Sequence, residues 1–231
     1  MADGAADLGI TGRDLVAEAD RPLEVLLDLG YGRCRLVAAA REESAWRSLA
    51  DLPDGTRVAT AFPRLAERLL AAAGRRVVVV PVSGAAEVAP HLGVADLIVD
   101  LVATGSTLKV NGLRELATLL DSSALLVARP AALGASGPGE RIGQLRTALE
   151  SVLNARDQRY LMANVPRARL RDVRDILPGL SGPTVVEVQN SGAHVAAHAV
   201  VAAADIYRVI GALKALGATG ILVTKIERLM P

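Results

Sequence analysis

The sequence predicts an α/β protein with a second, smaller α/β domain at its C-terminus. Apolar runs typical of strands alternate with helical segments through most of the chain, which favours a parallel sheet. From about residue 160 the order becomes strand, helix, strand, strand, helix, strand, the pattern of a ferredoxin-like fold. We therefore expect a first region over residues 1–159 and a separate domain over 160–231.

The first region reads as buried strands separated by short helices. Pro63 suits the first position of a helix that Gly74 ends. The run 75–82 is rich in β-branched residues, which predicts a strand buried on both faces. Segment 113–130 is ambiguous, and we favour two strands joined at Asp121-Ser122-Ser123. Further expected strands are 6–10, 23–29, 34–40, 56–62 and 95–102, with helices after Thr11, over 63–73 and, briefly, within 83–93.

A helix over 141–158 places apolar residues at positions that share one face, which predicts a buried face. The C-terminal domain is expected to contain Asp205 as a helix N-cap and Gly217 as the glycine after that helix. Its elements are expected at 160–166, 167–177, 183–189, 194–201, 205–217 and 218–229.

The composition excludes several classes of protein. Hydrophobic residues make up 51% and charged residues 22%, which is typical of a globular chain. A net charge of +1 with 2% aromatic residues argues against nucleic-acid binding. No apolar run reaches the roughly 18 residues of a membrane span, and the start lacks a signal-peptide pattern, so we expect a cytoplasmic protein with no membrane partner. The single cysteine, Cys34, fits a reducing compartment, and we expect it to be a small buried hydrophobe.

The stretch "DLVATGSTL", residues 100–108, combines small hydroxyl residues and glycine directly after an apolar strand. Gly105 permits backbone angles barred to other residues, so successive N–H groups can converge on an anion. Thr104, Ser106 and Thr107 add hydroxyl donors, and a short helix follows to about Asn111. Asp100 suits neighbouring sugar hydroxyls, so the stretch predicts a ribose 5-phosphate site; the alternative is a capped turn without a ligand.

This region resembles the ATP phosphoribosyltransferase family, the first enzyme of histidine biosynthesis. The resemblance is carried by "EVAPHLGVADLIVDLVATGSTLKVNGL" at 87–113, with further matches at 7–14, 26–39, 57–63 and 82–87. It implies a two-lobed catalytic region similar to periplasmic binding proteins. Lobe I would comprise about 1–35 and 136–159, and lobe II about 36–135.

The resemblance also implies the reaction, in which phosphoribosyl pyrophosphate transfers its ribosyl group to N1 of ATP and pyrophosphate leaves. Glu87 and Asp100 would serve at the reacting centre. Arg13, Asp14 and Phe62 would lie near ATP, although a surface turn and a core position are the alternatives. The ribosyl donor would be held by Ala103, Thr104, Gly105, Ser106, Thr107 and Leu108.

Catalysis of this kind is chiefly positioning and electrostatic stabilisation, and Mg²⁺ would neutralise the pyrophosphate. Mg²⁺ usually keeps several waters, so few protein ligands are expected and none is named. His91, His194 and His198 show no metal-ligand spacing, and we expect ordinary roles for them.

The C-terminal domain resembles the ACT-like regulatory domain of the long form of the family. That resemblance implies histidine as feedback inhibitor, with Asn164, Leu180 and Thr184 lining its pocket, and a homo-oligomer between dimer and hexamer. An oligomerising domain without a ligand is the alternative. The position of Asn164 often carries an acid in the family, and a neutral side chain there would weaken binding of the histidine ammonium.

The family begins before "DLGITGRD" with a strand, a basic loop and further elements, about 30 residues or more, and we expect these to be missing here. Two other functions remain open. One is a purine or pyrimidine salvage phosphoribosyltransferase, although Asp100 is followed by Leu101 rather than a second acid. The other is a non-catalytic amino-acid sensor.

Overall fold

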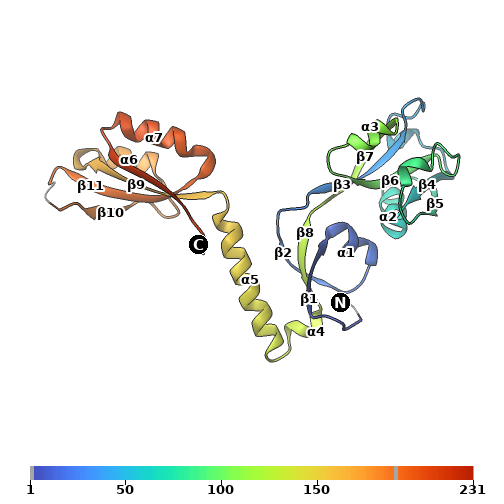
Figure 1. Ribbon diagram of the computed structural model, residues 1–231, viewed down its shortest axis with the longest axis horizontal. Coiled ribbons are helices and arrows are strands. Elements are labelled where there is room, and N and C mark those ends of the chain that lie inside the picture. Colours follow the sequence, from blue (N-terminus) through green and yellow to red (C-terminus); the bar gives the residue numbers. More distant parts are fainter. Residues whose placement is uncertain (1–2, 190–191, 231) are drawn as a thin grey trace. The chain divides into compact units, whose positions relative to one another are not determined.

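The computed structural model describes residues 3–189 and 192–230. The chain forms two compact units, Met1–Ile142 and Gly143–Pro231, and the division falls within helix α5, Pro138–Ala155 (Figure 1). Both units combine sheets with helices, which confirms the predicted fold class.

Unit 1 contains two sheets. The smaller, antiparallel sheet has the strand order β1-β8-β2, and the larger has the order β5-β4-β6-β3-β7. The strands are β1 Leu8–Gly12, β2 Glu24–Asp28, β3 Cys34–Arg41, β4 Thr56–Thr60, β5 Val77–Pro81, β6 Leu97–Val102, β7 Leu113–Ser122 and β8 Ala124–Ala128. The helices are α1 Arg13–Ala19, α2 Pro63–Ala72, α3 Ser106–Val110 and α4 Pro130–Leu133, with 3-10 turns η1 Leu49–Asp51 and η2 Ala86–Val88.

The larger sheet is mixed, so the prediction of a parallel sheet is wrong for part of it. Strand β4 runs parallel to β5 and β6, whereas β3 is antiparallel to both of its neighbours, β6 and β7. Strand β3 enters this sheet directly from β2, at the same crossover by which β7 leaves for β8 (Figure 1). Two strands joined to one crossover in opposite senses must run in opposite directions.

The expected buried strand at 75–82 is instead an edge strand. Strand β5 has only β4 beside it, and Val78 is 52% exposed. By contrast, residues 36–40 of β3 are buried, and Leu36 and Val37 have no exposed surface, because strands lie on both sides of β3 and side chains pack on both of its faces. The β-branched residues at 75–82 therefore indicated a strand correctly, but they did not indicate where in the sheet that strand lies.

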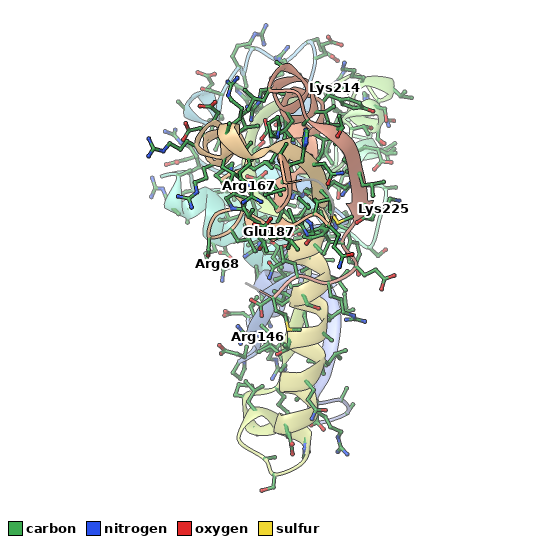
Figure 2. The ribbon with its side chains drawn as sticks, turned by 90° about the vertical axis from the view of Figure 1, so that its left-hand side faces the viewer. Arg68, Arg146, Arg167, Glu187, Lys214 and Lys225 are labelled. Carbon is green, nitrogen blue, oxygen red and sulfur yellow. The ribbon has the colours of Figure 1, made fainter. Side chains whose placement is uncertain are left out.

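Unit 2 is the predicted ferredoxin-like fold. Its four strands have the order β10-β11-β9-β12, all pairs antiparallel, and two helices cover one face. Figure 2 shows Arg167 beside Glu187 of β10, and their guanidinium and carboxylate groups form an ion pair. The elements are β9 Gln158–Pro166, η3 Arg167–Arg169, α6 Leu170–Ile176, β10 Thr184–Glu187, β11 His194–Ala202, η4 Ala203–Asp205, α7 Ile206–Ala215 and β12 Thr219–Lys225.

Two local predictions in unit 2 need correction. Asp205 occupies the N-cap position of α7 but makes no capping hydrogen bond, because its carboxylate binds Arg208 instead. Helix α5 buries the expected face only in part, since Ile142 is 7% exposed but Leu145 and Val152 are 44% and 42% exposed. Gly217 does follow α7 with a left-handed φ of +89°, as predicted. None of the helices in the described ranges is both long and apolar enough to span a bilayer.

Candidate functional site

The predicted anion-binding loop lies between the end of β6 and the start of α3. Gly105 has a left-handed φ of +81°, which an L-residue adopts only with strain. A side chain at this position would have room, because a Cβ would come no closer than 3.9 Å to Val102 Cγ1. The backbone angle therefore explains the glycine, as the sequence predicted.

The loop presents its hydroxyl groups to solvent. Thr104, Ser106 and Thr107 are all exposed, and Thr104 Oγ1 lies 3.0 Å from Ser106 Oγ. Leu108, by contrast, is 6% exposed and packs into the core beneath. Leu108 therefore anchors the loop in the core, while the hydroxyls above it stay at the surface.

Two carboxylates lie near this loop. Asp100 belongs to β6 and Glu87 to η2, which packs against β6, and both are half-buried. Burial raises the pKa of Asp100 above its ordinary value, and the negative charge of Glu87 raises it further. The backbone N–H of Leu101 donates to Asp100 Oδ1 at 2.7 Å and opposes this shift. The structure thus brings together the two residues that were expected at the reacting centre.

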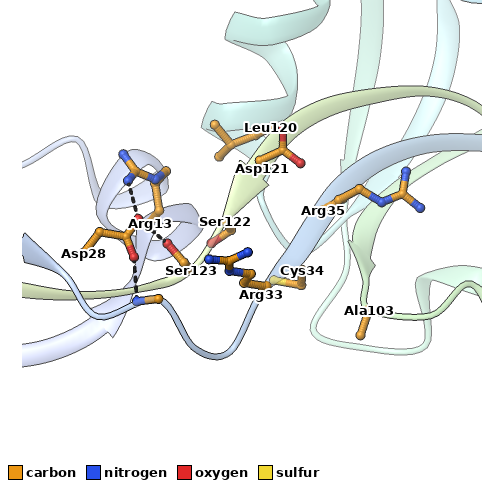
Figure 3. Close-up of a pocket in the computed structure, with 11 residues that line it drawn as sticks. Arg13, Asp28, Arg33, Cys34, Arg35, Ala103, Leu120, Asp121, Ser122 and Ser123 are labelled. Atoms are coloured by element: carbon orange, nitrogen blue, oxygen red, sulfur yellow. Dashed lines mark hydrogen bonds and ion pairs between the residues drawn. The ribbon is translucent and has the colours of Figure 1, made fainter. Parts of the chain in front are cut away.

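A cavity of about 980 Å³ lies at the crossover between the two sheets (Figure 3). Of the residues predicted from the sequence, Arg13 and Ala103 line it. Since Ala103 opens the anion-binding loop, the cavity connects that loop with the start of α1. The remaining lining residues are Asp28, Gly30, Arg33, Cys34, Arg35, Leu120, Asp121, Ser122 and Ser123.

Arg13 is held in the cavity wall by a chain of polar contacts. Its Nη2 donates to Asp28 Oδ2 at 3.1 Å, and the same oxygen accepts from Ser123 Oγ at 2.7 Å (Figure 3). Asp28 Oδ1 accepts from the backbone N–H of Gly30 at 2.9 Å. The hydrogen bonds from Ser123 and Gly30, together with Arg13, lower the pKa of Asp28 below its ordinary value.

Asp14 lies behind the cavity wall and is 5% exposed. The hydroxyl of Ser122 donates to Asp14 Oδ1 and accepts from the Asp14 backbone N–H at 3.2 Å. Gly12 makes room for this carboxylate, since a Cβ there would lie 2.3 Å from Asp14 Oδ1. The sequence placed Arg13 and Asp14 near a ligand but did not reveal the serines that hold them.

Cys34 differs from expectation, because it is half-buried and lines the cavity instead of filling the core. Partial burial, followed by the nearby charge of Asp14, raises the pKa of its thiol. A cysteine with a raised pKa is a poor nucleophile, so the thiol contributes bulk to the cavity wall.

Sequence reasoning also missed two arginines in the cavity wall. Arg35 forms a two-pronged pair with Glu115, in which Nη2 lies 3.0 Å from Oε2, and it also donates to Thr118. Arg33 makes no ion pair or hydrogen bond within residues 3–189 and 192–230. The cavity therefore presents one unneutralised guanidinium group, which suits a ligand carrying phosphates. The alternation Arg33-Cys34-Arg35 at the start of a strand was the available signal.

Other predicted residues lie elsewhere. Phe62 is 7% exposed and packs in the core of the larger sheet, the alternative expected for it. Asn164 and Thr184 lie on one face of the sheet in unit 2, because their partners Ala196 and His198 are two residues apart on β11. Leu180 is 58% exposed in the loop before β10.

Metal-binding side chains do not gather anywhere in the part of the chain that the structure describes: no three His, Cys, Asp or Glu side chains form a group that could hold an ion. The pair Glu87 and Asp100 offers at most two carboxylates. Mg²⁺ is commonly bound by one or two carboxylates together with substrate phosphates and water. The donor set therefore fits a cation that arrives with a phosphorylated substrate.

Unit 1 places a loop with three exposed hydroxyl groups near two carboxylates and a cavity that contains an arginine unpaired within the described ranges. These are features of an enzyme that acts on a phosphorylated sugar.

Comparison with known proteins shows which family of such enzymes the chain belongs to. The family model described as ATP phosphoribosyltransferase matches residues 1–151, and that of the HisG C-terminal domain matches 155–228. The chain belongs to the ATP phosphoribosyltransferase family, a family of pentosyl transferases that catalyse the first step of histidine biosynthesis.

Individual relatives agree with this assignment. The chain is 58% identical to the ATP phosphoribosyltransferase of Gemmatimonas aurantiaca, over 100% of this chain and 81% of the relative. It is 46% identical to that of Methanosarcina acetivorans, over 99% and 79%. Among solved structures, an ATP phosphoribosyl transferase (HisG:HisZ) complex from Thermotoga maritima matches 66% of this chain and 72% of that chain, with 29% identity and a TM-score of 0.57.

Proposed function

We propose that the loop Ala103–Leu108 binds the 5-phosphate of phosphoribosyl pyrophosphate and that this chain transfers the ribosyl group to N1 of ATP. The observation that carries this assignment is the loop itself, with three exposed hydroxyl groups on a backbone turned by Gly105. Hydrogen bonds to a charged phosphate contribute about 1.5–3 kcal/mol each, enough to fix the donor sugar.

The carboxylates next to the loop suit the ribose. Asp100 and Glu87 would accept hydrogen bonds from the sugar hydroxyls and face the positive charge that develops on the ribose carbon as pyrophosphate leaves. The raised pKa of Asp100 reflects the cost of holding its charge without a partner, and a developing cation would relieve that cost. No covalent nucleophile is needed.

Pyrophosphate leaves with several negative charges. Mg²⁺ bound to it would neutralise that charge, with Glu87 or Asp100 as the protein's oxygen ligands and water completing the shell. Arg33 would contact the phosphate groups directly, because its guanidinium lines the cavity without a carboxylate partner in the described ranges.

ATP would enter from the side of α1. Arg13 lines the cavity there, and Asp14 lies directly behind it. A cavity volume of about 980 Å³ leaves room for a nucleotide beside the sugar donor. Phe62 would act as core beneath this region.

Unit 2 would carry regulation and assembly. Histidine would bind as feedback inhibitor near Asn164, Leu180 and Thr184. A homo-oligomer, from dimer to hexamer, is supported by apolar side chains on the sheet face away from the helices, where Val186 and Leu222 are 47% and 56% exposed. A cytoplasmic location fits the single unpaired cysteine.

The test is a radiolabelled turnover assay of the purified chain with phosphoribosyl pyrophosphate and Mg²⁺. Formation of phosphoribosyl-ATP with ATP, and no product with free purine or pyrimidine bases, is the expected result. Product with a free base would instead assign a salvage activity. Histidine binding without any turnover would assign a sensor.

A further inference from the structure

Two consecutive serines at the crossover between the two sheets of unit 1 each hydrogen-bond to a different acidic residue, one in α1 and the other at the end of β2. Ser122 ends β7, and Ser123 links it to β8. Ser122 binds Asp14 through its hydroxyl, and Ser123 binds Asp28 through its hydroxyl at 2.7 Å. These contacts join positions 108 and 95 residues apart in the chain.

The crossover also forms hydrogen bonds with the backbone at the start of α1. The N–H of Arg13 donates to the carbonyl of Ser123 at 3.0 Å, and the N–H of Asp14 donates to Ser122 Oγ at 3.2 Å. The first two residues of α1 are therefore fixed to the crossover by backbone and side-chain bonds together.

The two serines are buried, whereas the groups that Ser123 supports are open to the cavity. Ser122 is 4% and Ser123 is 8% exposed, and the side chains of Asp28 and Arg13 are 46% and 41% exposed. An arginine side chain has several rotatable bonds, so its guanidinium stays in one place only when a fixed partner holds it. Asp28 is that partner, and the Ser123 hydroxyl and the Gly30 N–H fix Asp28 in turn.

We infer that Ser122 and Ser123 are positioning residues for the nucleotide side of the cavity. Ser123 orients Arg13 through Asp28, and Ser122 fixes Asp14. Neither hydroxyl needs to touch substrate. The inference rests on the proposed function, which assigns Arg13 and Asp14 to ATP, and it adds the elements that hold them in place.

The experiment compares variants of the whole chain by calorimetric ATP binding and by steady-state kinetics with both substrates. Ser123→Ala is expected to raise Kd and KM for ATP about tenfold, with KM for phosphoribosyl pyrophosphate unchanged. Ser123→Thr, which keeps the hydroxyl, is expected to restore ATP binding. Asp28→Asn breaks the same chain of contacts, so its effect combined with Ser123→Ala should be less than additive.

Ser151→Ala is the matched control for a merely structural role. Ser151 is 2% exposed in α5, donates to the Ala148 carbonyl at 2.8 Å and belongs to unit 2. Its loss should lower Tm without changing Kd for ATP. Ser122→Ala is measured in the same series. If Ser122→Ala does not fold, the Ser123 variants alone test whether the serines position the nucleotide side of the cavity.

The outcomes separate this inference from the proposed function. If Arg13→Ala weakens ATP binding while Ser123→Ala does not, the serine inference is wrong and the ATP site stands. If Ser123→Ala lowers Tm and weakens the binding of both substrates to the same extent, the serine has a structural role and the inference is also overturned. If Arg13→Ala leaves ATP binding unchanged, or the unsubstituted chain binds no ATP, the assignment on which the inference rests fails.

Discussion

The hydroxyl oxygens of Thr104 and Ser106 lie 3.0 Å apart and share one hydrogen bond on an exposed loop. A phosphate at this place would accept hydrogen bonds from both hydroxyls. Since hydrogen bonds to charged groups are about twice as strong as neutral ones, a phosphate would replace this contact at a net gain. Under the proposed assignment, both hydroxyls would therefore turn from each other to the phosphate when it binds.

Substituting Thr104 and Thr107 by valine tests this directly. Valine keeps the side-chain shape and removes the donor, so we expect KM for phosphoribosyl pyrophosphate to rise about tenfold or more for each change. Tm should stay constant, because both side chains are exposed. Steady-state kinetics with the ribosyl donor as the varied substrate measures the effect, and unchanged use of the donor by the double variant would contradict the phosphate assignment.

Replacing Gly105 by alanine tests the backbone of the same loop. Its φ of +81° would strain alanine by about 1–2 kcal/mol, so both stability and affinity for the ribosyl donor should fall. Gly55 is the matched control: its φ is +83°, and it lies in the turn before β4, at the opposite end of the larger sheet from the loop. Gly55→Ala should lower Tm similarly and leave KM unchanged. Equal kinetic effects of the two substitutions would show that the loop conformation is not specific to binding.

Local features of the fold could be predicted from the sequence because each depended on a short pattern. The junction of two strands at Asp121-Ser122-Ser123 and the glycine at 105 were both found by their residue types. The direction of β3 could not be found, because it depends on a crossover between strands that are distant in sequence. The position of β5 at a sheet edge escaped for the same reason, since composition does not record neighbours.

The candidate site likewise contains residues that the sequence could reveal and residues that only the folded structure brings together. Asp100 and the loop after it are contiguous, so their pattern was visible in the sequence. Ser123 and Asp28 lie 95 residues apart, and only folding shows that they share a hydrogen bond. The alternation Arg33-Cys34-Arg35 did not point to a site, because an arginine beside a strand is usually solvated, and the cavity shows what distinguishes Arg33.

In unit 2, Asn164→Asp should strengthen inhibition by histidine. The amide lies on the open face of the sheet, and Gly220 leaves space beside it, since a Cβ at Gly220 would be 3.1 Å from Asn164 Nδ2. A carboxylate would bind the histidine ammonium about 1 kcal/mol more strongly than an amide, which lowers the half-inhibitory concentration about fivefold. Inhibition curves measure this, with kcat and both KM values expected to stay constant. Unaltered inhibition would place the histidine site away from Asn164.

Asp100→Asn should stabilise the protein at neutral pH while impairing catalysis. Burial and the charge of Glu87 raise the pKa of Asp100 above its ordinary value of 3.8, so the folded state binds this proton more tightly than the unfolded state. Stability therefore falls as pH rises from the ordinary value through the raised one, and the loss persists at neutral pH. Asparagine carries no charge and keeps the oxygen that accepts from Leu101, so it avoids this loss.

Thermal unfolding of both proteins between pH 3 and pH 8 tests the argument. The variant should have the higher Tm at pH 7, and the difference should shrink as the solution is acidified below the ordinary aspartate range, where both unfolded and folded Asp100 are protonated. Turnover should fall at the same time, because the carboxylate that faces the ribose is lost, and functional groups are commonly retained at a cost in stability. A variant that is less stable at neutral pH, or a Tm difference independent of pH, would mean that the buried charge of Asp100 is already compensated in the folded protein.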